Sequence, residues 1–288
     1  MLRLRHLFIP VTASAVVALA VSSPVYAQGN SQHNKKSRPP SSSPLPGSAS
    51  GPAAGASPLA WLDDASLLTP GTMSLTVSAM RWSGTDVNEV DAPNVDVAVG
   101  LAPRLQLGAS VPHVVGSPDG TGPVGGVGTS YISAKIALMK GASGIKLAVA
   151  PMVEILGEGA VQALGPGQSR TQIGLPLSME LSQGPARVFA STGVFSRGAW
   201  FAGGGVGWQA TPRTGISTSF TRSWARDDST TGASRDRREL SGSVSYFLND
   251  QVGIFGSIGR TIATTDENGA GTSISGGISW LLNPPFTK

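Results

Sequence analysis

The chain has 288 residues, of which 38 are glycine, only 13% carry a charge and none is cysteine. The absence of cysteine excludes disulfide bonds and thiolate zinc sites, and a formal net charge of +4 is too small for a nucleic-acid-binding surface. Outside residues 7–21, no run of apolar residues is long enough for a helical membrane span.

The first residues have the pattern of a secretory signal peptide. A basic start at 1–6 precedes an apolar run at 7–21, and the small residues Val25 and Ala27 stand where a signal peptidase reads the chain. We therefore predict a signal peptide over 1–27. A short membrane anchor is disfavoured, because about 15 apolar residues are few for a span.

Residues 28–57 are rich in serine, proline and glycine and cannot bury a core, so we predict a periplasmic linker there. Its basic group at 35–38 leaves two roles open, a solvated spacer or a tether to peptidoglycan or another anionic surface. The stretch 58–68 is compatible with one or two helical turns at the periplasmic mouth, or with a simple cap on the first strand. The folded domain is expected over 58–288.

From about Gly71 onward, apolar and small polar residues alternate in units of about ten residues, and each unit ends in a turn. This alternation predicts strands with one apolar and one polar face. The fold class that follows is all-β, a single antiparallel transmembrane β-barrel of about twelve strands. The expected strands are 72–82, 93–101, 105–113, 129–139, 145–155, 171–182, 187–196, 199–210, 214–225, 238–248, 252–263 and 271–282.

Short and long connections also alternate, as in outer-membrane barrels with tight periplasmic turns and longer outer loops. Each short connection contains proline, glycine or asparagine. The short connections are 102–104, 140–144, 183–185, 211–213 and 248–250; the long ones are 83–92, 114–128, 156–170, 226–237 and 264–270. Only the outer connection near Arg197 is short. An even strand count places both ends of the barrel at the periplasmic rim.

The two faces of the strands differ in composition. In 199–210, Trp200, Val206 and Trp208 share one face and glycines fill the other, so we assign the first to lipid and the second to the lumen. Trp200 and Trp208 are separated by roughly 20 Å of membrane depth, the spacing of two aromatic girdles. The predicted girdle residues are Trp200, Trp208, Trp224, Tyr246 and Trp280. A soluble sandwich is disfavoured, because its outward polar face would be rich in lysine and glutamate.

Five charged residues are predicted in the lumen: Asp96, Lys135, Lys146, Glu154 and Glu180. If strands 145–155 and 171–182 pair about the middle of their loop, Lys146 faces Glu180 near the periplasmic side. Two roles stay open for these charges, a constriction that sets solute preference or internal neutralisation in a partly hydrated lumen.

Three arginines, Arg81, Arg222 and Arg260, fall on the lipid-facing side near the outer ends of their strands. An arginine facing lipid costs about 2–4 kcal/mol at the bilayer midplane but roughly 0–1 kcal/mol near the interface. We therefore expect outer-rim contacts with lipopolysaccharide phosphates, which guanidinium groups bind in a bidentate manner. The alternatives are that the side chains only extend to water, or that a bulge turns them inward.

Catalytic and metal-binding patterns are absent from the sequence. The folded part has one histidine, His113, and no serine stands in a G-x-S-x-G motif. The carboxylates between Asp227 and Asp236 lack calcium-ligand spacing, and the glycine clusters lack the lysine of a phosphate-binding loop. We expect no enzyme activity, no cofactor and no metal site.

Residues 100–112 (GLAPRLQLGASVP) read as a strand, a turn and a strand, and residues 126–138 (GVGTSYISAKIAL) read as the next strand. Both segments resemble the outer-membrane family named for the MetA pathway of phenol degradation, although Thr129 stands where that family usually has aspartate. Residues 150–157 (APMVEILG) follow the family more loosely. The resemblance implies an outer-membrane barrel for the passage of small, often hydrophobic, compounds.

The function expected from the sequence is therefore a bacterial outer-membrane channel or transporter for passive passage of small molecules, in which small interior residues leave space. Two alternatives stay open, a structural or surface-interaction barrel with a closed lumen and an outer-membrane lipid hydrolase. The expected partners are outer-membrane lipid and lipopolysaccharide, a small-molecule solute and the barrel-assembly machinery. No nucleic-acid partner is expected.

Overall fold

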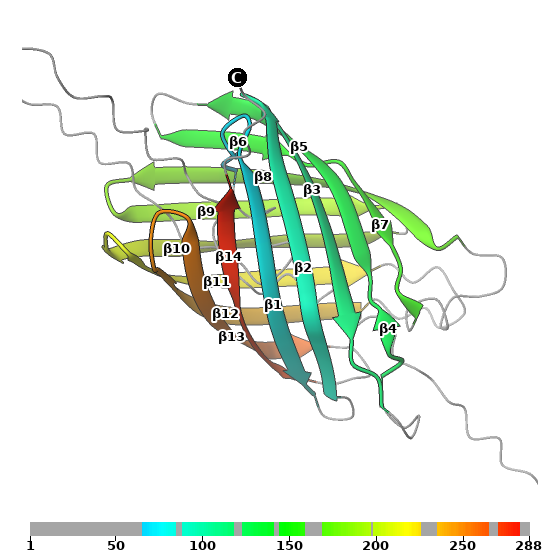
Figure 1. Cartoon of the computed structure of the whole chain (residues 1–288). Helices are drawn as coiled ribbons and strands as arrows, with labels where there is room; N and C mark the ends of the chain where they lie inside the picture. Colours follow the sequence, from blue (N-terminus) through cyan, green and yellow to red (C-terminus); the bar gives the residue numbers. More distant parts are fainter. Residues whose placement is uncertain are drawn as a thin grey trace, which may run out of the picture.

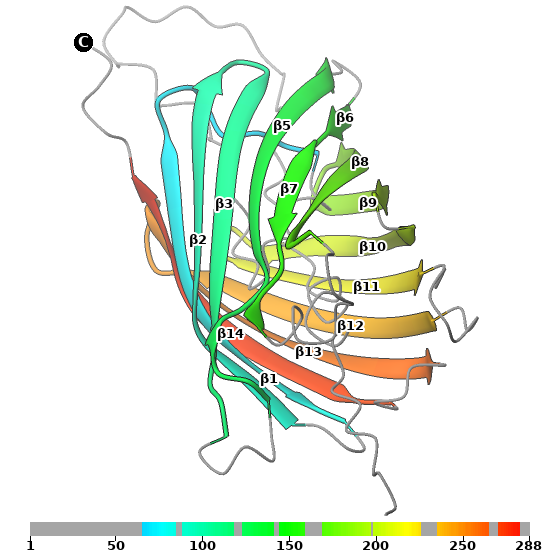
Figure 2. The ribbon, with the colours of Figure 1, turned by 90° about the vertical axis from the view of Figure 1, so that its right-hand side faces the viewer.

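The computed structural model describes residues 65–84, 88–117, 123–140, 144–158, 169–196, 198–225, 235–264 and 270–282. The predicted signal peptide and linker lie outside these ranges. The described residues form a closed antiparallel barrel, because β1 pairs with β14 as well as with β2 (Figure 1, Figure 2). The strands are β1 (Met73–Ser83), β2 (Asn88–Ala102), β3 (Leu105–Val114), β4 (Gly126–Val127), β5 (Ser130–Lys140), β6 (Ile145–Val149), β7 (Met152–Ile155), β8 (Thr171–Gln183), β9 (Ala186–Phe195), β10 (Ala199–Thr211), β11 (Thr214–Ala225), β12 (Arg235–Phe247), β13 (Val252–Thr264) and β14 (Thr272–Leu282).

Fourteen segments make twelve strands of the barrel wall, since two of those strands are interrupted. Segments β4 and β5 both pair with β3, and segments β6 and β7 both pair with β5 and β8. The expectation of one continuous strand over 145–155 was wrong at Pro151, which has no N–H for the ladder. The wall stays closed there, because Ala150 N donates to Pro176 O at 2.9 Å and Ala134 N donates to Pro151 O at 3.0 Å.

The prediction of a twelve-stranded barrel is confirmed, and most strand ends agree with the sequence pattern. The largest differences are at the outer rim, where β2 begins at Asn88 and β12 begins at Arg235, both earlier than expected. A bulge between Ser78 and Met80 in the β1 to β2 ladder accommodates one extra residue of β2, since the pairing passes from Asn94 to Asp91 there. The outer connections on these strands are correspondingly shorter than predicted.

The short connections have the turn geometry that their sequences favour. Gly184 in the β8 to β9 turn has φ of 56°, a region that glycine adopts without strain. In the turn between β12 and β13, Asn249 Oδ1 accepts hydrogen bonds from the backbone N–H groups of Gln251 and Val252 at 2.8 and 2.9 Å. These turns hold the register of each hairpin, and with it the face on which every side chain lies.

Apolar side chains cover the outside of the barrel, and small polar side chains line the inside. Val206 and Trp208 on β10 are 51% and 50% exposed, whereas Ser219 and Ser245 on the inner face are only 4% and 1% exposed. This pattern is the reverse of a soluble barrel and is typical of a barrel whose outer wall contacts lipid. No helix in the described part of the chain has the length and apolar character needed to cross a membrane.

Many interior glycines do not leave open space, in contrast to the expectation from the sequence. Phe189 of β9 lies over Gly205 of β10, where an added Cβ would approach the ring to 2.6 Å. Phe255 of β13 covers Gly277 of β14 in the same way, at 2.7 Å. Aromatic rings that fold over glycines on the neighbouring strand stabilise strand pairing and fill part of the lumen.

Candidate functional site in the lumen

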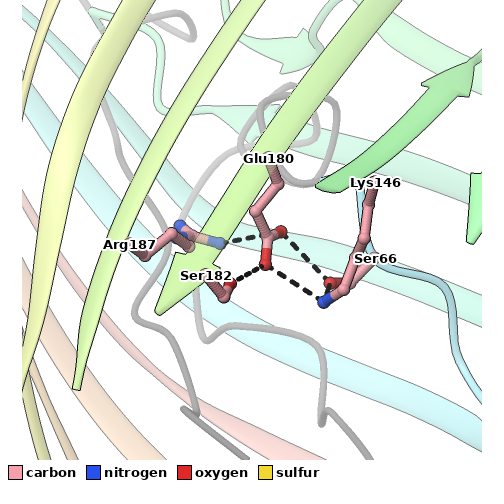
Figure 3. A network of polar contacts seen from close by, with 5 residues as sticks. All are labelled: Ser66, Lys146, Glu180, Ser182 and Arg187. Atoms are coloured by element: carbon pink, nitrogen blue, oxygen red, sulfur yellow. Dashed lines mark hydrogen bonds and ion pairs between the residues drawn. The ribbon is translucent and has the colours of Figure 1, made fainter. Parts of the chain in front are cut away.

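A buried ionic cluster lies inside the barrel near the periplasmic end of β6, β8 and β9 (Figure 3). Glu180 of β8 is its centre and faces Lys146 of β6 across the ladder, as the sequence register predicts. Lys146 Nζ lies 3.1 Å from Glu180 Oε1, and Arg187 Nη1 lies 3.5 Å from Glu180 Oε2. Ser182 Oγ donates a further hydrogen bond to Glu180 Oε1 at 2.7 Å.

Burial makes this inner cluster energetically important. Glu180 and Arg187 are each 1% exposed, while Lys146 is 33% exposed. The Arg187 guanidinium also lies over the ring of Phe189, with its Cζ 4.6 Å from the ring centroid. Charges removed from water are tolerated only when they are paired and hydrogen-bonded, and the Glu180 carboxylate provides that pairing.

The residues just before β1 complete this cluster from a distant part of the sequence. Ser66 Oγ accepts a hydrogen bond from Lys146 Nζ at 2.6 Å and donates one to Glu180 Oε2 at 3.1 Å. Two residues later, Leu68 N donates to Gln106 Oε1 of β3 at 2.8 Å. We refer to residues 65–72 as the N-terminal segment.

The N-terminal segment lies within the periplasmic mouth of the barrel. Figure 2 shows its trace crossing the mouth from β1 toward β6 and β8. Ala65 and Leu68 are 2% and 4% exposed, and Gly71 N donates to Gly100 O on the inner face of β2 at 2.8 Å. The sequence left a helical turn or a cap open for 58–68; residues 65–68 are not helical, and residues 58–64 lie outside the described ranges.

An apolar cluster forms the lumen wall beside the interruption between β6 and β7. Tyr131, Ala150, Met152 and Phe201 are buried together, and Phe195 packs against them. The rings of Phe195 and Phe201 are 6.3 Å apart at an angle of 44°. This part of the lumen therefore presents aromatic and aliphatic surface rather than charge.

A second ionic cluster lies near the outer end of the lumen on β12 and β13. Arg237 Nε donates to Glu239 Oε1 at 2.8 Å, and Arg237 Nη2 donates to Thr261 Oγ1 at 3.0 Å. The guanidinium lies 5.1 Å from the ring centroid of Trp82, which is itself 2% exposed. Cation and ring are thus packed together inside the barrel near its outer end.

The structure places all five predicted lumen charges on the inner face, but it does not bring them into one site. Lys135 and Glu154 are each 1% exposed and Asp96 is 6% exposed. Lys135 faces Gln106 across the ladder, and Glu154 faces Tyr131. Of these five residues, Lys146 and Glu180 lie together as an ion pair. The roles predicted for these residues stay predictions.

Trp82, Arg187, Arg237 and Glu239 are lumen residues that the sequence interpretation missed. Glu239 shares the inward alternation of the serines on β12, so the pattern contained a signal for it. Arg237 was missed because the strand was predicted to begin at residue 238, which left Arg237 in the outer connection. Arg187 stood at the predicted start of its strand, where the alternation is hardest to assign.

On the outer face, Trp200 and Trp224 pair across β10 and β11 at the outer end. At the opposite end, Trp208, Tyr246 and Trp280 lie within a few residues of the periplasmic turns. The predicted arginines Arg81, Arg222 and Arg260 are exposed on the outer face, so no bulge turns them inward. Contact of these residues with lipid is not part of the structure and stays a prediction.

No group of three or more histidine, cysteine or acidic residues in the described ranges could hold a metal ion. His113 is exposed at the outer end of β3, opposite Val127 of β4. The hydrogen bonds found among the described residues do not include its side chain. The geometry therefore contains no serine and histidine pair at this position.

Comparisons with known proteins identify the fold. No family model and no curated protein matches the chain. Among solved structures, the barrel is similar to the COG4313 outer membrane channel from Pseudomonas putida F1, with a TM-score of 0.58, 14% identity, and coverage of 76% of this chain and 98% of the channel. It is also similar to the NanC porin, with a TM-score of 0.53, 9% identity, and coverage of 72% and 100%.

At these identities the similarity shows the fold alone, which is that of outer-membrane porin and channel barrels. The exposed apolar band agrees with this fold, and the location of the chain is the bacterial outer membrane.

Proposed function

We propose that the protein is a passive outer-membrane channel for small molecules, and that small apolar compounds are among its solutes. The observation that carries this proposal is the composition of the lumen wall. The lumen wall carries an aromatic and aliphatic cluster around Phe201 and Met152 in addition to an inner ionic cluster at Glu180 and an outer one at Arg237. A lumen with both kinds of surface offers contacts to a compound with an apolar body and a polar group.

Two further observations support a channel. The solved structure from Pseudomonas putida F1 with a similar barrel is described as an outer membrane channel. The segments 100–112 and 126–138 resemble the family named for the MetA pathway of phenol degradation, which implies small and often hydrophobic solutes. The apolar cluster of the lumen wall is the feature of this chain that supports small apolar solutes.

The first test is conductance after folding in detergent. We expect the purified chain to show a heat-dependent shift in electrophoretic mobility, which indicates a folded barrel, and to produce discrete current steps in planar bilayers. Vesicles that contain the protein should also take up a small phenolic compound faster than a sugar of similar size. A folded barrel with no current and no uptake would favour the structural alternative, and release of fatty acid from phospholipid would favour the hydrolase.

The lumen lysines provide a second test. Replacing Lys135 and Lys146 with glutamine should shift ion selectivity toward cations, since removal of fixed positive charge lowers the barrier for cations in a narrow pore. Reversal potentials in a salt gradient measure this shift. The matched control is Arg104→Gln, in the β2 to β3 turn outside the lumen. Unchanged reversal potentials would show that the two lysines do not line the conducting path.

A further inference from the structure

Four exposed arginines form a row on the outer wall of the barrel. Arg81 lies on β1, Arg222 on β11, Arg238 on β12 and Arg260 on β13, and all four side chains are on the outer face. These strands are consecutive in the wall apart from β14, which separates β13 from β1. Among strand residues with described side chains, arginine faces outward only on these four strands. We refer to these residues as the arginine row.

The arginine row lies at one height in the membrane. Each member is eight or nine residues from the periplasmic end of its strand. At about 3.3 Å per residue and a tilt near 40°, this separation is roughly 20 Å, close to the far side of an apolar band about 25 Å tall. Below the row the same faces carry exposed Ile258 and Phe220, and exposed Leu240 and Ile274 lie beside it. The row therefore lies where the apolar wall meets the outer leaflet headgroups.

The charges of the arginine row are only partly compensated. Arg222 and Arg238 face each other directly across the ladder, and Asp236 bridges them with contacts of 2.8 and 3.2 Å. Arg260 Nη1 donates only to the hydroxyl of Thr272, at 2.8 Å. Neither Arg81 nor Arg260 has an ion pair with a described residue. Among the described residues, one carboxylate, that of Asp236, pairs with members of the row, so the row attracts anions.

The two arginines without a carboxylate are spaced for a shared anion. Arg81 pairs with Ile274 of β14, and Arg260 pairs with Thr272 of the same strand. Neighbouring strands are about 4.8 Å apart, so the two backbones are separated by roughly 10 Å, with a further offset of about 7 Å along the strand. Two long arginine side chains can converge across this distance on one phosphate group, and each can donate two hydrogen bonds to it.

We propose that the arginine row binds phosphate groups of lipopolysaccharide in the outer leaflet, and that Arg81 and Arg260 hold one such phosphate between them over β14. The proposal concerns the outer wall and is independent of what passes through the lumen. Lipopolysaccharide fits better than a protein partner, because the row borders an apolar wall that lipid chains cover.

The test compares thermal unfolding of the folded barrel in two membranes. One contains phosphatidylethanolamine and phosphatidylglycerol, and the other contains the same lipids with lipopolysaccharide. We expect lipopolysaccharide to raise the melting temperature of the unmodified protein by on the order of 5 °C. The variant R81Q/R260Q should lose most of this rise. The matched control R104Q/R213Q, at the periplasmic turns, should keep it.

Three outcomes would overturn the proposal. These are a full rise in R81Q/R260Q, an equal rise with dephosphorylated lipopolysaccharide, and an equal rise when extra phosphatidylglycerol replaces lipopolysaccharide. Should R81Q/R260Q fail to assemble, R81K/R260K keeps both charges but loses bidentate geometry. It should show a reduced rise, and a full rise in that variant would also contradict the proposal.

Discussion

Replacing Glu180 with glutamine should destabilise the barrel by about 3 kcal/mol or more, the cost of removing one partner from a buried ion pair. Glutamine preserves the shape of the side chain but removes the negative charge that faces Lys146 and Arg187. Arg187 is 1% exposed and cannot recover the lost interaction from water. Denaturant unfolding of the barrel in lipid vesicles, followed by tryptophan fluorescence, measures this change.

Two matched variants separate the charge of Glu180 from its hydrogen bonds. Ser182→Ala removes one hydrogen bond to the same carboxylate without changing any charge, and should cost only about 1 kcal/mol. The double variant E180Q/R187M removes a buried charge of each sign and should recover part of the lost stability. If E180Q alone unfolds within about 1 kcal/mol of the unmodified protein, the inner cluster is hydrated and the argument from burial is wrong.

The barrel was predictable from the sequence, because lipid and lumen place opposite demands on alternate residues of every strand. That demand is visible on β10, where Val206 and Trp208 face lipid and Gly205 and Gly207 face the lumen. The tight turns then determine the register, and the register alone placed Lys146 opposite Glu180. The break at Pro151 could also have been anticipated, since proline cannot donate a ladder hydrogen bond.

The contents of the lumen were less predictable, because they depend on contacts between strands far apart in the sequence. Phe189 covers Gly205 only because β9 and β10 pair in one particular register, and composition alone suggested empty space at that glycine. The contact of Ser66 with Lys146 spans 80 residues of sequence and comes from a segment without strand or helix periodicity. No alternating pattern could have located it.

The N-terminal segment is packed against a glycine that a larger side chain would displace. At Gly100, on the inner face of β2, an added Cβ would lie 2.3 Å from Thr69 O and 2.7 Å from Leu68 O. Both oxygens belong to the backbone, so the segment itself would have to move. Gly242, on the outer face of β12, offers a control for placing valine in a strand, because a Cβ there would meet only Ser217 O, at 3.9 Å.

We therefore predict that Gly100→Val raises the conductance of the channel several-fold, whereas Gly242→Val leaves it unchanged. The valine side chain would force residues 68–69 away from β2 and weaken the hydrogen bond from Leu68 N to Gln106. The periplasmic mouth would then lose the segment that crosses it. Single-channel currents in planar bilayers measure the effect, and deletion of residues 28–68 should reproduce it. If both changes leave the current of a folded barrel as it was, then the N-terminal segment does not obstruct the conducting path, and the narrowest point must lie deeper, at the ionic or aromatic clusters of the lumen.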